Sequence, residues 1–239
     1  MQSEINDLWH KATDIWSNPT VSLWKKVKKI TFEMAVIIGS ILLAQYIERQ
    51  REQRHEAREA KEFLLGLKED ISEDIVEIND VVESFGEYKS LYNFLGNYDP
   101  RKVPNKDSIN DIVMLMRSNA FLRPNTSRFE GFKTSGKLDQ IENKEILNDI
   151  LTFYQDAIPK LQSSTTGWVN YHGKLNDYML DNLVEYPNGK SNFEQIIVTP
   201  KARNLCKRLV PWGQLFERHN HAKDMGNLII VKIAKEYNL

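Results

Sequence analysis

The sequence predicts an all-α protein made of an N-terminal amphipathic helix, one transmembrane helix that continues into a charged stalk, and a soluble helical bundle. Three observations favour this fold class. The run at 30–47 lacks the polar stripe that a soluble helix keeps. The charged stretch after it contains no glycine or proline before Gly66, and apolar residues then recur at three- and four-residue spacing. The predicted boundaries of the four parts are 1–26, 27–47, 48–96 and 97–239.

The first part of the chain predicts a helix with an apolar and aromatic stripe. A stripe of this kind, followed by a lysine cluster, suits a helix that lies in the membrane interface. The acidic residues Glu4, Asp7 and Asp14 equally suit a helix that packs on another subunit or on the protein's own bundle. Asn18-Pro19 ends the pattern. The stripe residues are Ile5, Leu8, Trp9, Ala12, Ile15 and Trp16.

Residues 30–47 predict the membrane anchor. At about 1.5 Å per helical residue they extend roughly 27 Å, close to the ~30 Å thickness of the hydrocarbon core. Lysines stand before the run, arginines stand after it, and Tyr46 lies where an interfacial aromatic residue is expected. The uncharged part from Met34 onward is only about 14 residues long, a length at which a buried core helix is the alternative.

Small residues and one carboxylate in the span are candidate assembly residues. Two small-xxx-small pairs have the spacing that lets transmembrane helices approach closely. Glu33 is the single charged residue of the run, and such residues commonly face a bundle interior or a partner. It also lies near the end of the span, where it can reach the headgroups or pair with Lys29. The two small-residue pairs are Ala35/Gly39 and Ser40/Ala44.

The stretch Glu48–Glu62 carries both charges densely. We expect it to project as a helical stalk, because it has little apolar surface to bury. Beyond it, an apolar stripe from Leu64 to Phe85 predicts either a coiled coil of about three heptads, which favours oligomers, or one long helix of an antiparallel bundle. The expected supporting ion pairs are Glu48/Arg51, Arg49/Glu52 and Arg58/Glu62.

The rest of the chain predicts the helices of the bundle. Gly136 is expected to end one helix in the left-handed conformation, Asn143 to cap the next, and Pro159 to kink or restart it. Thr199 is expected to cap a helix that begins with a proline. Phe193–Val198 fits either a short strand or a helical turn. The expected helices cover 109–116, 127–134, 144–158, about 163–186, 200–209 and the C-terminal segment to Tyr237.

Three segments resemble motifs of an uncharacterised bacterial family of single-pass membrane proteins. Residues 33–47 resemble its glutamate-led span, 63–70 its Phe-Leu-x-x-Leu-x-x-Asp segment, and 127–138 its Thr-Phe/Tyr-Glu-x-Leu-Lys-Ser-Ser/Thr-Gly-x-Leu pattern. The likeness covers roughly residues 30–155 and departs at Phe132, where the family favours leucine. The resemblance implies a membrane anchor, a helical bundle and a location in the bacterial inner membrane, but it brings no known activity.

The third of these segments contains a candidate anion-binding corner made of Arg128, Lys133 and the Ser135-Gly136 turn. The structural interpretation of the same residues is simpler. Phenylalanines bury against neighbouring helices, an acidic residue complements the helix dipole in the first turn, and the glycine stops the helix. The sequence favours the structural interpretation and leaves the anion site as the alternative.

The sequence contains no Walker loop, nucleophile elbow, His-Glu-x-x-His motif or cysteine-rich metal spacing. Glu217, His219, His221 and Asp224 form the single histidine–carboxylate cluster. Residues two apart face different sides of a helix, so the cluster predicts a solvated polar surface rather than a metal site. We therefore expect no catalytic residue, cofactor or metal.

Cysteine usage and net charge exclude further classes. The lone Cys206 excludes an intramolecular disulfide framework. Its neighbours Lys207 and Arg208 could lower the pKa of the thiol. A net charge of −1 argues against nucleic acid as a partner, because nucleic acid usually binds a basic surface.

Two classes of function remain. The first is a non-enzymatic, membrane-anchored interaction or signalling module, whose partners are the lipid bilayer, further copies of the chain and an unidentified protein or ligand. A variant of this class is an effector whose assembled spans disturb the membrane, with Glu33 lining the assembly. The second class is an enzyme of unrecognised type with a carboxylate and histidine pocket. Basic residues on the two sides of the span are nearly balanced and favour only slightly a cytoplasmic N-terminus.

Overall fold

The computed structural model describes residues 23–102, 112–113, 115–116, 118–187 and 190–238. Over this part of the chain the secondary structure is helical, with an isolated bridge between Glu185 and Ser191 and no strand. This confirms the predicted all-α class. The fold divides into two compact units, one ending at Glu59 and one beginning at Ala60. The predicted N-terminal helix at 5–16 lies outside the described residues.

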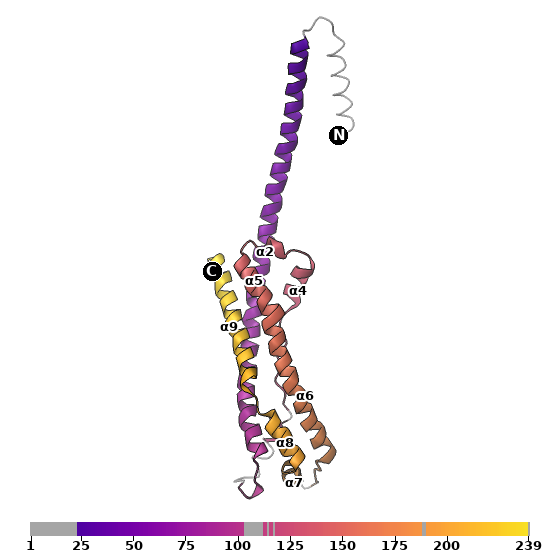
Figure 1. Ribbon diagram of the computed structural model, residues 1–239, viewed down its shortest axis with the longest axis vertical. Helices are drawn as coiled ribbons and strands as arrows, with labels where there is room; N and C mark the ends of the chain where they lie inside the picture. Colours follow the sequence, from indigo (N-terminus) through magenta and orange to yellow (C-terminus); the bar gives the residue numbers. More distant parts are fainter. Residues whose placement is uncertain (1–22, 103–111, 114, 117, 188–189, 239) are drawn as a thin grey trace. The chain divides into compact units, whose positions relative to one another are not determined.

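Helix α2 runs without interruption from Leu23 to Gly96, a length of 74 residues (Figure 1). It confirms the predicted continuous helix through the apolar run and the charged stretch. Its most apolar window has a mean hydropathy of 1.8 and is not buried, so α2 contains a segment long and apolar enough to cross a membrane. Large exposed apolar side chains in this segment are Phe32, Met34, Val36, Ile37, Ile38, Ile41, Leu42, Leu43, Tyr46 and Ile47.

Three long helices lie along one another in the second unit. They are the part of α2 from Ala60, α6 (Ile158–Asn182) and α9 (Gly213–Glu236). Helices α2 and α6 run in the same direction and α9 runs in the opposite one (Figure 1). One cluster of buried side chains joins α2 to α5 (Lys144–Thr152) and to the second half of α9. A second cluster joins the C-terminal end of α2 to α6.

The apolar stripe of α2 is buried inside this bundle. The antiparallel-bundle interpretation of the stripe is therefore confirmed, and the stripe is not an exposed seam for a coiled coil. Helix α9 comes close to α2 at Gly226, where a Cβ atom would lie 3.0 Å from Ile71 and 3.1 Å from Ile75. A glycine at this position allows the two helices to approach. The fully buried residues of the stripe are Leu64, Leu67, Ile71, Ile78 and Phe85.

The interruption predicted at Pro159 is a π-helical turn, Phe153–Ala157, between α5 and α6. Proline has no N–H group, and its ring crowds the preceding turn of a helix. The wider π turn accommodates it, with the N–H of Ile158 donating to the carbonyl of Phe153. The expected start of the next helix near Ser163 is wrong, because the helix restarts directly at Ile158.

Helix α6 ends at Asn182, whereas the sequence predicts an end near Tyr186. Leu183 is extended, with φ −75° and ψ 125°. The Asn192 side chain then stabilises the turned chain: its Oδ1 accepts from the N–H of Val184 at 2.7 Å, and its Nδ2 donates to the carbonyl of Asn182 at 3.0 Å. Helical periodicity does not report a contact between segments this far apart, which is why the predicted end is wrong.

Three predicted helix caps are confirmed. Gly136 has φ +72°, the left-handed conformation expected after a helix. The Asn143 side chain accepts from two N–H groups of the first turn of α5, and the Thr199 hydroxyl accepts from the N–H of Ala202 at 3.3 Å. The helical turn, not the strand, is the structure of the segment after Asn192. The remaining elements are α4 (Ser127–Thr134), α7 (Phe193–Ile197), α8 (Pro200–Leu209), two 3-10 helices (Pro100–Lys102 and Leu138–Gln140) and the helical residues 112–113 and 115–116.

Candidate functional site

The small residues predicted to assemble the span form two exposed pairs, which lie on different faces of α2. A Cβ atom at Gly39 would have no neighbour within 4 Å. The Ser40 hydroxyl donates to the carbonyl of Val36 at 2.8 Å, so its hydrogen bond is made within the helix. Ala35 and Ala44 are also exposed. The four residues therefore offer low bulk rather than polar groups, as close approach of a second helix requires.

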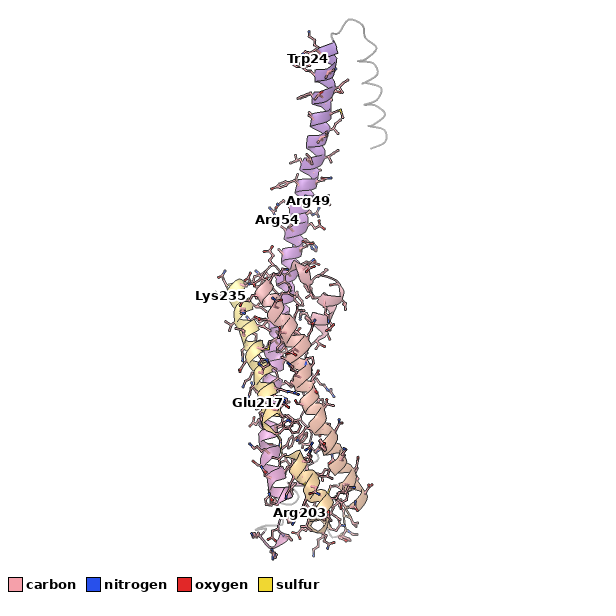
Figure 2. The ribbon with its side chains drawn as sticks, in the orientation of Figure 1. Trp24, Arg49, Arg54, Arg203, Glu217 and Lys235 are labelled. Atoms are coloured by element: carbon pink, nitrogen blue, oxygen red, sulfur yellow. The ribbon has the colours of Figure 1, made fainter. Side chains whose placement is uncertain are left out.

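Charged side chains on α2 before Ala60 are largely without ion-pair partners. No ion pair joins Glu33 to Lys29 in the described part of the chain, so the predicted local pairing is not formed. The three ion pairs predicted after the span are not formed either, among the residues that the structure describes. The pair that is present joins His55 Nδ1 to Glu59 Oε2 at 3.6 Å. Arg49 and Arg54 extend from the helix (Figure 2).

Two of the motif segments contact each other in the second unit. Arg128 Nε donates to Asp70 Oδ2 at 2.8 Å. Its guanidinium lies against Gly66, where any larger side chain would collide with it. One turn along, the rings of Phe63 and Phe132 stack with centroids 3.9 Å apart. The segment at 63–70 and the segment at 127–138 thus form one packed junction between α2 and α4.

An acidic face of α2 holds the backbone of the loop that precedes α4. Asp74 Oδ1 accepts from the N–H of Asn125 at 2.9 Å, and Glu77 Oε1 accepts from the N–H of Arg123 at 3.2 Å. Asp74 is fully buried, and its Oδ2 has no hydrogen-bond partner. Burial raises the pKa of the Asp74 carboxyl to about 6, and the Glu77 carboxylate adds to the shift. The stripe pattern places an acid here without showing that it is buried.

The residues of the predicted anion-binding corner already have partners within the chain. Arg128 pairs with Asp70, and Lys133 Nζ lies 3.5 Å from Glu130 Oε2. The Ser135 hydroxyl donates to the carbonyl of Phe132 at 2.8 Å. Gly136 serves as the helix cap. The anion site stays a prediction, and the packing contacts account for each of its residues.

The histidine cluster is divided by burial, so its interpretation as a solvated surface is wrong for one member. His219 is fully buried, while Glu217, His221 and Asp224 are exposed; Glu217 is labelled in Figure 2. His219 Nδ1 donates to the carbonyl of Leu215 at 2.7 Å, and desolvation lowers its pKa. No group of three His, Cys, Asp or Glu side chains among the described residues could hold a metal.

A second buried histidine belongs to an aromatic layer that the sequence does not reveal. His172 stacks on Trp168 with centroids 5.1 Å apart. Its Nε2 donates to the carbonyl of Met116 at 2.6 Å, and its Nδ1 accepts from Asn176. Desolvation lowers the pKa of His172. Trp168 Nε1 donates to the carbonyl of Leu209 at 2.8 Å. Desolvation outweighs the bond to the Met116 carbonyl, which acts in the opposite direction on the pKa, and the bonds of this layer serve packing.

Cys206 is not the activated thiol that its basic neighbours suggest. The side chain is fully buried, and desolvation raises the pKa of the thiol to about 12. Lys207 and Arg208 are exposed on other faces of α8. The expectation of a lowered pKa is therefore wrong, because neighbours in sequence do not share a face of a helix.

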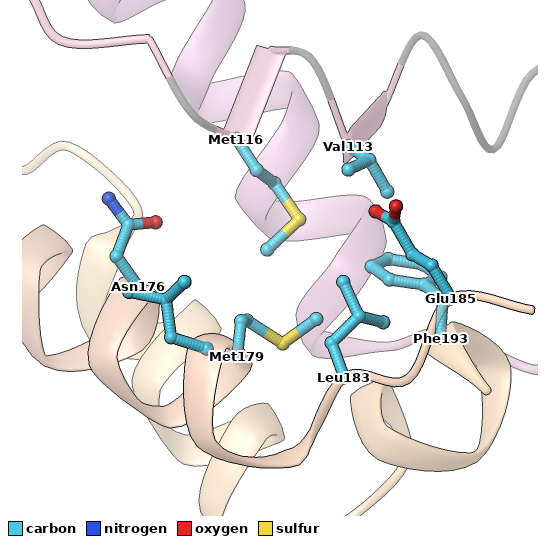
Figure 3. Close-up of a pocket in the computed structure, with 8 residues that line it drawn as sticks. Val113, Met116, Asn176, Met179, Leu183, Glu185 and Phe193 are labelled. Carbon is cyan, nitrogen blue, oxygen red and sulfur yellow. The ribbon is translucent and has the colours of Figure 1, made fainter. Parts of the chain in front are cut away.

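A cavity of about 590 Å³ lies beside the C-terminal end of α6 (Figure 3). This volume falls within the range of small-molecule sites. Met116 and Met179 point toward one another across it, and the Glu185 carboxylate lies at its edge (Figure 3). Its residues come from distant parts of the chain, so no local pattern predicts it. The lining residues are Val113, Met116, Asn176, Met179, Leu180, Leu183, Glu185 and Phe193.

No family model, curated protein or solved structure matches this chain.

Proposed function

We propose that this protein is a non-enzymatic, single-pass membrane-anchored module that self-associates through α2 and binds a ligand or protein through its bundle. The observation that carries the proposal is the exposed apolar segment of α2. Each large apolar side chain moved from water into an apolar medium contributes about 1.5–3 kcal/mol. No other part of the described fold packs against this run of apolar residues, which favours lipid as its surroundings. The bacterial inner membrane is the membrane that the motif resemblance favours.

The bundle supplies the binding half of the proposal. Its apolar cavity at the end of α6 suits a small apolar molecule, since Met, Leu, Val and Phe side chains dominate the lining. The buried histidines and Cys206 have structural roles instead. Because α2 contributes both the apolar segment and the central helix of the bundle, anchor and binding domain share one element. An effector that disturbs the membrane is the variant in which Glu33 lies inside the assembled spans.

The anchor is tested by placing one charge in the middle of the apolar segment. Ile38→Arg is expected to lower the share of the protein in the alkali-resistant membrane fraction, because an arginine at the centre of a span costs about 2.5–3.5 kcal/mol. Val76→Arg is the matched control. Val76 is 61% exposed on the same helix, within the second unit, and this variant should stay with the membranes. Recovery of the unaltered protein in the soluble fraction would refute the anchor.

A further inference from the structure

The charged segment of α2 at 48–59 carries a row of arginines and a row of glutamates on different faces, and Arg49 lies beside the glutamate row. Three arginines follow one another at spacings of three and four, and three glutamates do so at spacings of four. Residues at these spacings lie on the same face of a helix. We name the two rows the basic ladder and the acidic ladder. The basic ladder is Arg51, Arg54 and Arg58, and the acidic ladder is Glu48, Glu52 and Glu56.

Each ladder places like charges next to one another, although Glu48/Arg51 and Arg49/Glu52 also bring opposite charges together at a spacing of three. Like charges three or four residues apart repel, whereas an alternation of signs at that spacing would attract. None of the six side chains has an ion pair within the described part of the chain, and five of the six are exposed. The repulsion within each ladder is therefore not offset by a close ion pair among the described residues. A partner that presents the opposite sign to each ladder would relieve it.

The two ladders lie about 120° apart around the helix, at 100° per residue. They are different surfaces, so in a contact between copies the basic ladder of one can meet the acidic ladder of another, either reciprocally in a two-fold pair or successively around a ring. In a membrane where all copies share one orientation, parallel copies set side by side bring the basic ladder of one against the acidic ladder of the next. A two-fold pair makes two such contacts, and a head-to-tail contact closes as a ring where the rotation between copies allows it.

The span supports the same contact. Glu33, Ser40 and Ala44 precede Arg51 at spacings of seven, four and seven, so they continue the face of the basic ladder. This face combines small side chains, which permit close approach, with the one carboxylate of the span, which is more stable inside an assembly than against lipid. A contact made by the basic ladder would therefore extend into the membrane.

We propose that the basic ladder of α2 binds the acidic ladder of a second copy of this chain, in an assembly of parallel copies. The inference rests on the proposed membrane-anchored function and deepens it, because it names the surface that self-associates. It assigns the charged segment a partner of stated chemistry, and it predicts that association weakens as salt rises, since the paired side chains are exposed at their edges.

Charge reversal with mixing tests the proposal. One full-length variant carries Arg51→Glu, Arg54→Glu and Arg58→Glu, and the other carries Glu48→Arg, Glu52→Arg and Glu56→Arg. Two differently tagged copies are expressed together, and co-purification from mild detergent is measured. Each variant with itself should co-purify about tenfold less than the unaltered chain, because like ladders meet. The two variants together should recover most of the unaltered level, because opposite ladders meet again.

A triple variant elsewhere controls for the loss of three cations. Lys89→Glu, Lys174→Glu and Lys201→Glu change exposed lysines of the second unit, and co-purification should be unaffected. Undiminished association of the reversed variants, or no recovery on mixing, would overturn the ladder contact. Membrane pelleting is measured in parallel. A chain that associates through the ladders but is recovered in the soluble fraction would refute the anchor and leave the ladder contact standing.

Discussion

Asp74 is a carboxylic acid enclosed by α2 and the loop before α4. Burial raises the pKa of its carboxyl to about 6 from 3.8, the Glu77 and Asp70 carboxylates act in the same direction, and the bond from Asn125 opposes them. The phenol of Tyr154 is another titratable group close to the Asp74 carboxyl. The folded pKa lies above the unfolded one, so the folded state binds the proton more tightly. Stability is therefore gained as the pH falls through 6, and the gain is complete below about 4.

Asp74→Asn should stabilise the protein at neutral pH. The amide oxygen still accepts from the N–H of Asn125, while the buried charge is removed. We expect the free energy of unfolding to rise by about 2 kcal/mol at pH 7.5, and the difference from the unaltered protein to shrink toward zero at pH 4. Denaturant unfolding of the full chain in detergent at the two pH values measures this.

Asp224→Asn is the matched control for this charge change. Asp224 is exposed on α9, so the free energy of unfolding should change by less than about 0.5 kcal/mol at either pH. A destabilisation by Asp74→Asn at pH 7.5 would show that the ionised carboxylate is required by the loop, contrary to the argument from desolvation.

The crossing of α2 and α9 depends on one glycine. At Gly226 an added methyl group would press on Ile71 and Ile75, whereas at Gly167 in α6 it would meet nothing within 4 Å. Gly226→Ala should therefore destabilise the bundle by about 1–3 kcal/mol through overpacking. Gly167→Ala should stabilise it by up to about 1 kcal/mol, because alanine is the better helix former. Thermal unfolding of both variants measures these effects. Equal changes in Tm for the two variants would contradict the close approach of α2 and α9.

At the scale of the whole molecule, labelling of an introduced cysteine can determine on which side of the membrane the bundle lies. Cys206 is buried and should not react with the reagent, so the unaltered protein serves as the unlabelled control. Asn204→Cys places a thiol on the exposed face of the same helix. With a cytoplasmic N-terminus, an impermeant thiol reagent should label this variant in intact cells. Labelling only after lysis would place the bundle inside and reverse the predicted topology.

Local signals were sufficient where the interaction itself is local. The caps at Gly136, Asn143 and Thr199 follow from side chains that bond backbone groups within three residues or relieve backbone strain in place. The unbroken helix α2 follows from a long stretch without helix breakers. The exposed apolar segment can likewise be predicted from the sequence, because hydropathy is a sum over neighbours in sequence.

The burial of individual polar side chains could not be predicted from the sequence in the same way. The same helical pattern that exposes His221 buries His219, and the sequence around Cys206 suggests activation although the fold desolvates it. Such outcomes depend on which face of a helix meets another helix, and that is decided by contacts between residues far apart in the chain.

The sequence by itself determined the all-α class, the apolar segment, the two charged rows after it and most helix ends, because each depends on the spacing of residues along one helix. The tertiary structure alone decided that the stripe of α2 belongs to a bundle core rather than an exposed seam. It alone enclosed Asp74, lowered the pKa of the buried histidines by desolvation and formed the apolar cavity. Helical spacing specifies that a face must be covered, and only packing specifies what covers it.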